Sequence, residues 1–253
     1  MIKALGVIPA RYGSTRFEGK VLADILGKPM LQHVWERVKE ARLLDEVIIA
    51  CDDQRIIEAA EGFGAKAVFT SKNHDCGSDR IAEVVNPIEV KVIINIQGDE
   101  PLVHPTMIDS LARTLLEDQS LCMATLIKRI DDPAEAGDPN IVKVVKDKDD
   151  FALYFSRAAI PHPAREPKEE PVYFKHIGIY AYTKDFLFTY KNFPAADYEN
   201  VERLEQLRVL KQGYRIKLIE TKFETIGVDT PEDLERVSNY LRQEGSNAPS
   251  ESL

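Results

Sequence analysis

The first 120 residues alternate short apolar runs with amphipathic stretches, and this rhythm constrains the fold more than any other feature of the chain. Apolar runs that fit strands are found at residues 4–8, 47–50, 67–69 and 92–96. Helical spacing of apolar residues, or helix-ending signals, predict helices at residues 31–41, 53–63 and 105–116. Repeats of strand, helix and strand predict a mainly parallel sheet with a ligand crevice at the carboxyl ends of its strands. We therefore expect an α/β fold.

The rhythm changes after residue 120. Predicted strands follow at residues 122–127, 141–145, 151–155 and 176–182 with little helix between them, which indicates a smaller, largely antiparallel section. The charged, proline-rich residues 160–172 predict a loop or arm. Helices are predicted again at 197–210 and 231–241. In the first half of the chain, Pro29 suits the first turn of the helix predicted at 31–41. We expect a single domain over residues 1–243 and a flexible tail at 244–253.

Composition and charge narrow the class of protein. Apolar residues make up 44% and charged residues 30%, and no apolar run is long enough to span a bilayer. The chain enters a strand at once, without the pattern of an export signal, so we expect it in the cytoplasm. A net charge of −9 argues against nucleic-acid binding, whereas a single nucleotide needs only a local group of cations. Cys51, Cys76 and Cys122 fit neither a disulfide framework nor a zinc ribbon and are expected to be free thiols.

A cationic, glycine-containing loop follows the first predicted strand directly, with the sequence IPARYGSTRFEGK at residues 8–20. Glycine lets backbone N–H groups turn toward an anion, while arginine and lysine match phosphate oxygens. The loop predicts a triphosphate site that uses Arg11, Arg16 and Lys20. The plainer alternative is a solvated basic loop.

Two commoner phosphate loops do not fit this segment. The interval from Gly13 to Gly19 is one residue too long for a P-loop, and Lys20 is followed by Val21 instead of Ser or Thr. Gly6, Gly13 and Gly19 are too widely spaced for a dinucleotide fingerprint. The chemistry of a nicotinamide cofactor is therefore disfavoured.

Two acidic motifs are candidate metal ligands. Asp99 follows the apolar run 92–96 in the sequence QGDEP, where a predicted strand ends at the crevice. Asp229, in GVDTPED, precedes a predicted helix and could supply a second carboxylate. Mg²⁺ needs only one or two protein carboxylates when substrate phosphates also bind it. The ordinary alternatives are a turn residue for Asp99 and a helix cap for Asp229.

A polar cluster, TSKNHDCGSDR at residues 70–80, lies between the third predicted strand and a helix. Ser78 could cap that helix, but a cap explains neither Gly77 nor Arg80. His74 stands beside Cys76 without further ligands, so we do not expect zinc.

The second half of the chain offers groups that fit an acidic sugar. His176, Tyr180 and Tyr182 alternate on one face of a predicted strand, and Arg157 follows the run 151–155. Such a sugar needs a cation for its carboxylate and partners for its hydroxyls. The plainer alternatives make the two tyrosines sheet surface and Arg208 half of a helix ion pair.

These motifs, in order over nearly the whole chain, resemble the sugar nucleotidyltransferases and most closely the CMP-Kdo synthetases (3-deoxy-manno-octulosonate cytidylyltransferases). The first motif of that family is I-P-A-R-x-x-S-x-R-x-P-G-K, and Glu18 stands here in place of its proline. The resemblance implies a Rossmann-like nucleotidyltransferase fold and a homodimer. It implies transfer of CMP from CTP to 3-deoxy-D-manno-octulosonate (Kdo), with release of pyrophosphate, for lipopolysaccharide synthesis. Alternatives are another acidic sugar, such as 8-amino-Kdo or sialic acid, or a non-catalytic nucleotide-sugar binding module.

The resemblance also implies residue roles. Half 1–120 would bind the nucleotide, and half 121–243 would bind the sugar and form the dimer. Catalytic roles are implied for Arg11, Lys20, Asp99 and Asp229, with the two carboxylates holding Mg²⁺ at the α-phosphate. Nucleotide binding is implied for Ala10, Arg11, Ser14, Arg16, Lys20, Ser71, Gly77, Ser78, Arg80 and Gln97. Sugar binding is implied for Arg157, His176, Tyr180, Glu205 and Gln206, the last two from the family motif L-E-Q-L-R.

Overall fold

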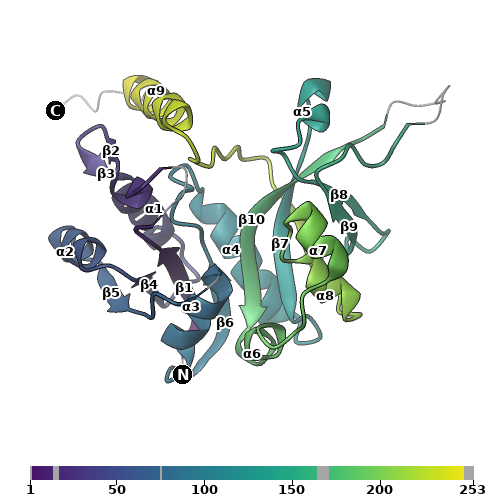
Figure 1. The fold of residues 1–253 in the computed structure, drawn as a ribbon, viewed down its shortest axis with the longest axis horizontal. Helices are drawn as coiled ribbons and strands as arrows, with labels where there is room; N and C mark the ends of the chain where they lie inside the picture. Colours follow the sequence, from purple (N-terminus) through teal and green to yellow (C-terminus); the bar gives the residue numbers. More distant parts are fainter. Residues whose placement is uncertain (1, 14–16, 75, 164–170, 248–253) are drawn as a thin grey trace.

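The computed structural model describes residues 2–13, 17–74, 76–163 and 171–247. Its helices and strands alternate along most of this chain (Figure 1). In chain order the described elements are β1 (Ile2–Ala10), η1 (Lys20–Leu22), β2 (Asp24–Ile25), β3 (Lys28–Pro29), α1 (Met30–Lys39), β4 (Glu46–Cys51), α2 (Gln54–Gly62), β5 (Lys66–Phe69), α3 (Gly77–Val85), β6 (Val90–Asn95), α4 (Pro105–Glu117), β7 (Met123–Arg129), α5 (Pro133–Gly137), β8 (Lys143–Lys146), β9 (Ala152–Ser156), β10 (Phe174–Thr183), α6 (Lys184–Tyr190), α7 (Asp197–Glu202), α8 (Leu207–Lys211), β11 (Lys217–Glu220) and α9 (Pro231–Asn247).

One nine-stranded sheet runs through both halves of the described chain. Its main path is β11-β7-β10-β6-β1-β4-β5, and β8 pairs with both β10 and β9. β1 is parallel to β4 and β6, and β4 to β5, whereas β10 is antiparallel to β6 and β7. Because β11 is parallel to β7, the carboxyl ends of all strands on the main path except β10 lie at one edge of the sheet. The predicted mainly parallel sheet with a smaller antiparallel section is confirmed.

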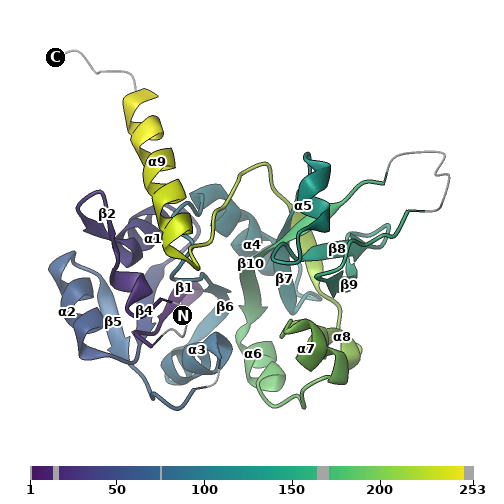
Figure 2. The same cartoon turned by 45° about the horizontal axis from the view of Figure 1, so that its top comes forward.

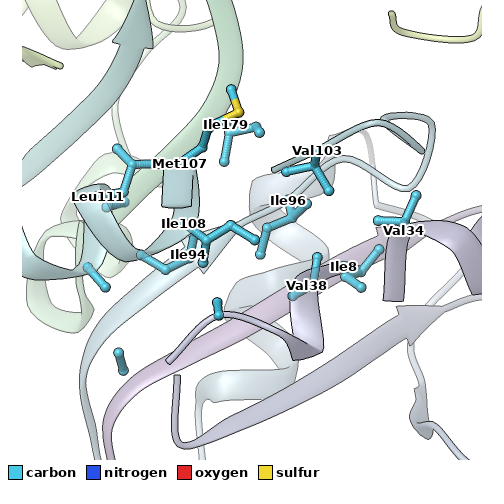
Figure 3. Close-up of a cluster of buried hydrophobic side chains, with 14 of the residues drawn as sticks. Ile8, Val34, Val38, Ile94, Ile96, Val103, Met107, Ile108, Leu111 and Ile179 are labelled. Atoms are coloured by element: carbon cyan, nitrogen blue, oxygen red, sulfur yellow. The ribbon is translucent and has the colours of Figure 1, made fainter. Parts of the chain in front are cut away.

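The sheet is covered by helices on both faces, which explains why its first strand is a continuous apolar run. Ile8 on β1 packs on the face covered by α1, α2 and α4, while Leu5 and Val7 pack on the face covered by α3 and α6. Figure 3 shows Ile8 near Val34 and Val38 of α1. Both clusters bury their members almost completely, so the strand ends are held on a rigid support.

Helix α9 lies at one end of the molecule beside β2 and β3, and Figure 2 shows it extending away from the sheet. Its buried Val237 packs with Ile25, Met30, Leu102 and Val228 in a small separate cluster. This packing brings the start of α9 close to the loop that follows β6.

Several predicted boundaries differ from the structure. The single helix expected at 197–210 is two helices, α7 and α8, because Arg203 adopts a left-handed φ of 54° and breaks the helix. Helix α9 continues to Asn247, so residues 244–247 are helical and the predicted tail begins too early. Pro29 precedes α1 as its N-cap instead of lying in the first turn. The sequence analysis did not predict β11, α6 or the β2–β3 pair.

Other expectations concern the cysteines and the membrane. All three cysteines carry free thiols, as predicted. Within the described part of the chain, no helix combines the length and the apolar character needed to cross a bilayer. Of the predicted loop at 160–172, residues 164–170 lie outside the described residues, and the remainder forms no helix or strand.

Candidate active site

Three charged side chains from distant parts of the chain meet at the carboxyl edge of the sheet. Gly19, whose φ of 68° lies in the left-handed region that favours glycine, starts the short helix η1 that carries Lys20. Lys20 Nζ donates to Asp99 Oδ2 at 2.6 Å and to Asp229 Oδ1 at 2.9 Å. The Val228 N–H also donates to the carbonyl oxygen of Asp99 at 2.9 Å. The structure thus brings together the two acidic motifs and the cationic loop.

The charges at this meeting point depend on each other. Burial acts to lower the pKa of Lys20, but the nearby carboxylates of Asp99 and Asp229 outweigh it and raise the pKa above its ordinary value. Lys20 therefore stays protonated at neutral pH. Burial, followed by the charge of Asp99, raises the pKa of the neighbouring Glu100 to about 8.

A cleft of about 390 Å³ opens beside these residues. The predicted nucleotide-binding residues that line it are Ala10, Arg11, Lys20, Gly77, Arg80 and Gln97. Ser14 and Arg16 lie outside the described residues. Ser71 is not among the described residues that line the cleft. Its side chain is exposed, and its hydroxyl accepts a hydrogen bond from the Asn73 N–H at 3.1 Å. Ser78 faces a neighbouring pocket instead.

Arg80 reaches the cleft as half of a buried ion pair. Its Nη2 donates to Asp52 Oδ2 at 2.8 Å, and its Nη1 donates to the hydroxyl of Thr70. Asp52 Oδ1 accepts from the Tyr12 N–H at 3.1 Å, which ties the cationic loop to this pair. Arg80 therefore helps to fix the wall of the cleft, and its implied role in nucleotide binding stays a prediction.

A smaller side pocket of about 80 Å³ adjoins the cleft, because Gly77 and Gln97 line both cavities. Of the predicted sugar-binding residues, Tyr180, Glu205 and Gln206 line this side pocket. Gln206 is 4% exposed, and its Nε2 has no hydrogen-bond partner among the described residues. A buried donor without a partner is costly, so the pocket is suited to a ligand that accepts hydrogen bonds.

Four further residues line the side pocket that the sequence analysis did not assign to the sugar: Ser78, Asn95, Tyr182 and Tyr190. Tyr182 interacts with the side chains of Asn95 and Ser78, and Tyr190 interacts with that of Glu205. Asn95 Oδ1 also accepts from Gln97 Nε2 at 3.0 Å, which fixes the amide at the boundary of the two cavities. One signal was available in the sequence: Asn95 is a polar residue within an otherwise apolar strand.

Two predicted sugar-binding residues are used by the protein itself. Arg157 donates through Nε to the carbonyl oxygen of Glu202 at 2.8 Å and through Nη1 to that of Pro139 at 2.9 Å. His176 lies between the rings of Phe155 and Tyr180, and burial lowers its pKa to about 3. Burial thus disfavours a charged His176 ring, and the sugar-binding role that the resemblance implies for His176 stays a prediction.

The plainer alternatives from the sequence have mixed outcomes. Tyr182 is only 1% exposed, so the interpretation of this residue as sheet surface is wrong. Arg208 donates through Nε to both carboxylate oxygens of Glu199, at 3.1 and 3.0 Å, and is thus half of an ion pair. His74, which lines the cleft, pairs with Glu83.

A mainly parallel sheet with a cationic loop after β1 and a pair of carboxylates at its carboxyl edge defines a nucleotide-binding α/β protein with the fold of the nucleotidyltransferases. The chain belongs to the cytidylyltransferase family, whose family profile matches residues 5–219.

Similar proteins cover almost the whole chain. The 3-deoxy-manno-octulosonate cytidylyltransferase of Solibacter usitatus is 52% identical over 240 residues, which cover 95% of this chain and 95% of that protein. The protein of the same name from Fusobacterium nucleatum is 50% identical over 243 residues, covering 96% and 98%. The structure of a CMP:2-keto-3-deoxy-manno-octonic acid synthetase complexed with CTP superposes with a TM-score of 0.91 at 45% identity, covering 96% of this chain and 99% of that one. A Leptospira borgpetersenii cytidylyltransferase, 15% identical with a TM-score of 0.62 and covering 100% and 99%, shares the fold.

Proposed function

We propose that this protein transfers CMP from CTP to Kdo, giving CMP-Kdo and pyrophosphate, and so activates the sugar for lipopolysaccharide synthesis. The observation that carries this proposal is the meeting of Lys20, Asp99 and Asp229 at a cleft lined by the cationic loop. Relatives that are 45–52% identical and named for this chemistry support it.

Magnesium is the cofactor that the family implies, and the residues present fit it. The ammonium of Lys20 lies 2.6 Å from Asp99 Oδ2 and 2.9 Å from Asp229 Oδ1, so the two carboxylates already share one cation. Paired carboxylate oxygens suit Mg²⁺, with phosphate oxygens and water as its other ligands. Asp99 and Asp229 would hold the ion, which when bound supplies Lewis-acid polarisation of the phosphate oxygens.

The reaction is a displacement at the α-phosphorus. The anomeric hydroxyl oxygen of the sugar forms the new bond and pyrophosphate leaves, so no covalent protein intermediate is needed. Arg11 and the protonated Lys20 offset the charge on the phosphates from the wall of the cleft. Because the side pocket adjoins the cleft through Gly77 and Gln97, a sugar held there lies next to the nucleotide.

The side pocket supports a hydroxyl-rich acceptor. Gln206 Nε2 offers a buried donor, and the Glu205 side chain, which interacts with Tyr190, offers acceptors. We assign the acceptor carboxylate to no residue in the side pocket, since the residues that line it include no Arg, Lys or His. The adjoining cleft, which shares Gly77 and Gln97 with the side pocket, does contain cations, among them Arg11 and Lys20.

We also infer a homodimer in the cytoplasm. Among the described strands, β9 pairs in a ladder only with β8, and its other edge makes one backbone bond, from the Ala152 N–H to the Ile216 carbonyl oxygen at 3.0 Å, so most of that edge has no strand beside it. Leu153 on β9 is 60% exposed and Val201 of α7 is 83% exposed, which is unusual for large apolar side chains. Free strand edges beside apolar surface favour association. Light scattering on the wild-type protein and on Leu153→Lys would test the dimer, with a monomer expected for the variant.

Pyrophosphate release tests the proposed function. The wild-type protein is assayed with CTP and Mg²⁺ and with Kdo, 8-amino-Kdo or sialic acid as acceptor. We expect release that requires CTP, Mg²⁺ and a sugar, with Kdo the best acceptor. Faster release with either other sugar would contradict the assignment of Kdo. Binding of CTP without release with any of the three would indicate a binding module.

A further inference from the structure

Glu100 is a buried carboxyl group beside the active site to which the proposed reaction assigns no role. It ends the turn after β6, where its N–H donates to the Gln97 carbonyl oxygen at 3.3 Å. Its Oε2 is buried and has no hydrogen-bond partner among the described residues. Burying a carboxyl oxygen without a hydrogen-bond partner costs free energy. The contacts of the Glu100 side chain therefore suggest what it does.

The side chain of Glu100 contacts the segment that leads to α9. Its carboxyl group interacts with the side chain of Thr225. A Cβ atom on Gly227 would lie only 3.2 Å from Glu100 Oε1, closer than ordinary side-chain contact. The next residue, Val228, donates its N–H to the carbonyl oxygen of Asp99 at 2.9 Å. Residues 225–228 therefore lie directly against the turn that carries Asp99.

We propose that Glu100 is a positioning residue that holds residues 225–228 in place, so that Asp229 faces Asp99 and Lys20. The segment has no helix or strand of its own, and Val228 is its only fully buried side chain among residues 223–228. Glu100 supplies a second attachment through Thr225, and Gly227 permits the close approach. The catalytic consequence rests on the proposed function, whereas the structural claim does not.

Amide hydrogen exchange in the metal-free, nucleotide-free protein tests the structural claim. The Val228 N–H reports directly on the contact between the segment and the Asp99 turn. We expect Glu100→Ala to speed exchange of residues 225–229 about tenfold, because the attachment through Thr225 is lost. Exchange within β1 should be unchanged. Equal acceleration in β1, or no acceleration at 225–229, would overturn the proposal.

Two further variants separate positioning from a loss of packing. Glu100→Gln keeps the size of the side chain and an oxygen for Thr225, so its exchange should match the wild type. Thr225→Val removes the same contact from the other side with little change in shape, and should speed exchange at 225–229 as Glu100→Ala does. Wild-type exchange in Thr225→Val would count against the proposal even if Glu100→Ala failed to fold.

A double-mutant cycle with Gly227 tests the close approach itself. Gly227→Ala places a methyl group against Glu100 Oε1 and should speed exchange in the same segment. In the double variant Glu100→Ala, Gly227→Ala, the methyl group gains room, so the combined effect should be smaller than the product of the two single effects. Simple multiplication of the two effects would overturn the proposal.

Turnover connects the structural claim to catalysis. We expect Glu100→Ala to raise the Mg²⁺ concentration for half-maximal pyrophosphate release about tenfold, with Glu100→Gln near the wild type. Absence of release by the wild type would refute the proposed function, while the exchange results would still decide the positioning role. Normal Mg²⁺ dependence in a Glu100→Ala protein with accelerated exchange would refute the catalytic consequence.

Discussion

The cleft and the side pocket lie next to each other but are lined by different kinds of side chain. In the cleft, Lys20, Asp99 and Asp229 carry full charges and follow strands or lie in loops at one edge of a parallel sheet. In the side pocket, neutral phenols and amides predominate, and Gln206 is a buried donor. Arg157 and His176, which the sequence offered for sugar binding, do not line the side pocket, and Arg157 donates to two backbone carbonyl groups instead. Charge at the carboxyl edge of a parallel sheet thus indicated a site here, whereas charge in the antiparallel section did not.

The largest effect is expected from a variant that breaks the charge cluster of the cleft. Lys20→Met should lower kcat for pyrophosphate release about 10²–10³-fold, because a cation beside the phosphates is lost. The temperature of unfolding should change little by comparison. Steady-state kinetics together with thermal unfolding would check both expectations.

Lys28→Met is the matched control for that variant. Lys28 also pairs with a carboxylate, that of Glu36 at 2.8 Å, but it is 45% exposed and does not line the cleft. We expect unchanged kcat and a loss of at most about 1 kcal/mol of stability, as for other surface ion pairs. Equal kinetic effects of the two variants would remove Lys20 from the mechanism.

Arg157 offers the sharpest contrast between the two cavities. Arg157→Ala removes the donors that two backbone carbonyl groups use, so we expect a loss of about 1–3 kcal/mol in the free energy of unfolding. The KM for Kdo should rise much less than in a variant that touches the side pocket. Urea unfolding and acceptor kinetics on the same samples would separate the two. A large rise in the KM for Kdo with unchanged stability would restore the role that the family resemblance implies.

Gln206 tests the side pocket directly. Gln206→Leu keeps most of the volume but removes the buried donor, so the KM for Kdo should rise about tenfold while the KM for CTP stays the same. Kinetics with each substrate varied in turn would measure this difference. A rise in the KM for CTP alone would mean that the side pocket belongs to the nucleotide.

The prediction for His176 concerns stability alone, with a pH dependence of known sign. Burial lowers its pKa from 6.5 to about 3 in the folded protein, so below pH 6.5 the unfolded chain binds the extra proton. This group therefore lowers the stability as the pH falls from 6.5 toward 3, with a slope approaching about 1.4 kcal/mol per pH unit. Urea unfolding of the wild type and His176→Gln at pH values between about 5 and 7 would measure it. Parallel stability curves for the two proteins would contradict this explanation.

The parallel half of the fold was predictable from residues alone because its signals are local. The apolar runs of β1, β4, β5 and β6 are typical of strands buried on both faces, and the helices between them have a clear period. The positions of Asp99 and the cationic loop follow from the direction of those strands. Asp229 is different, since it comes more than a hundred residues later and its placement beside Asp99 depends on the packing of α9.

The rest required the tertiary structure for physical reasons. Nothing in the local sequence shows that the Arg157 guanidinium would be used by the carbonyl groups of residues 139 and 202, because those partners are distant in the chain. Tyr182 on β10 and Tyr190 on α6 line the same side pocket because α6 packs against the sheet, which is a tertiary contact. The break between α7 and α8 depends on a left-handed Arg203, a conformation that the sequence does not signal.

Binding of Mn²⁺ in the presence of a non-hydrolysable CTP analogue tests most directly whether Asp99 and Asp229 hold one ion together. Calorimetry would compare the wild type with Asp99→Asn, Asp229→Asn and the double variant. If both carboxylates bind the same ion, each single variant should weaken binding at least about tenfold, and the double variant should be little worse than either. Full-affinity binding by either single variant, or independent losses that multiply in the double variant, would contradict a shared site.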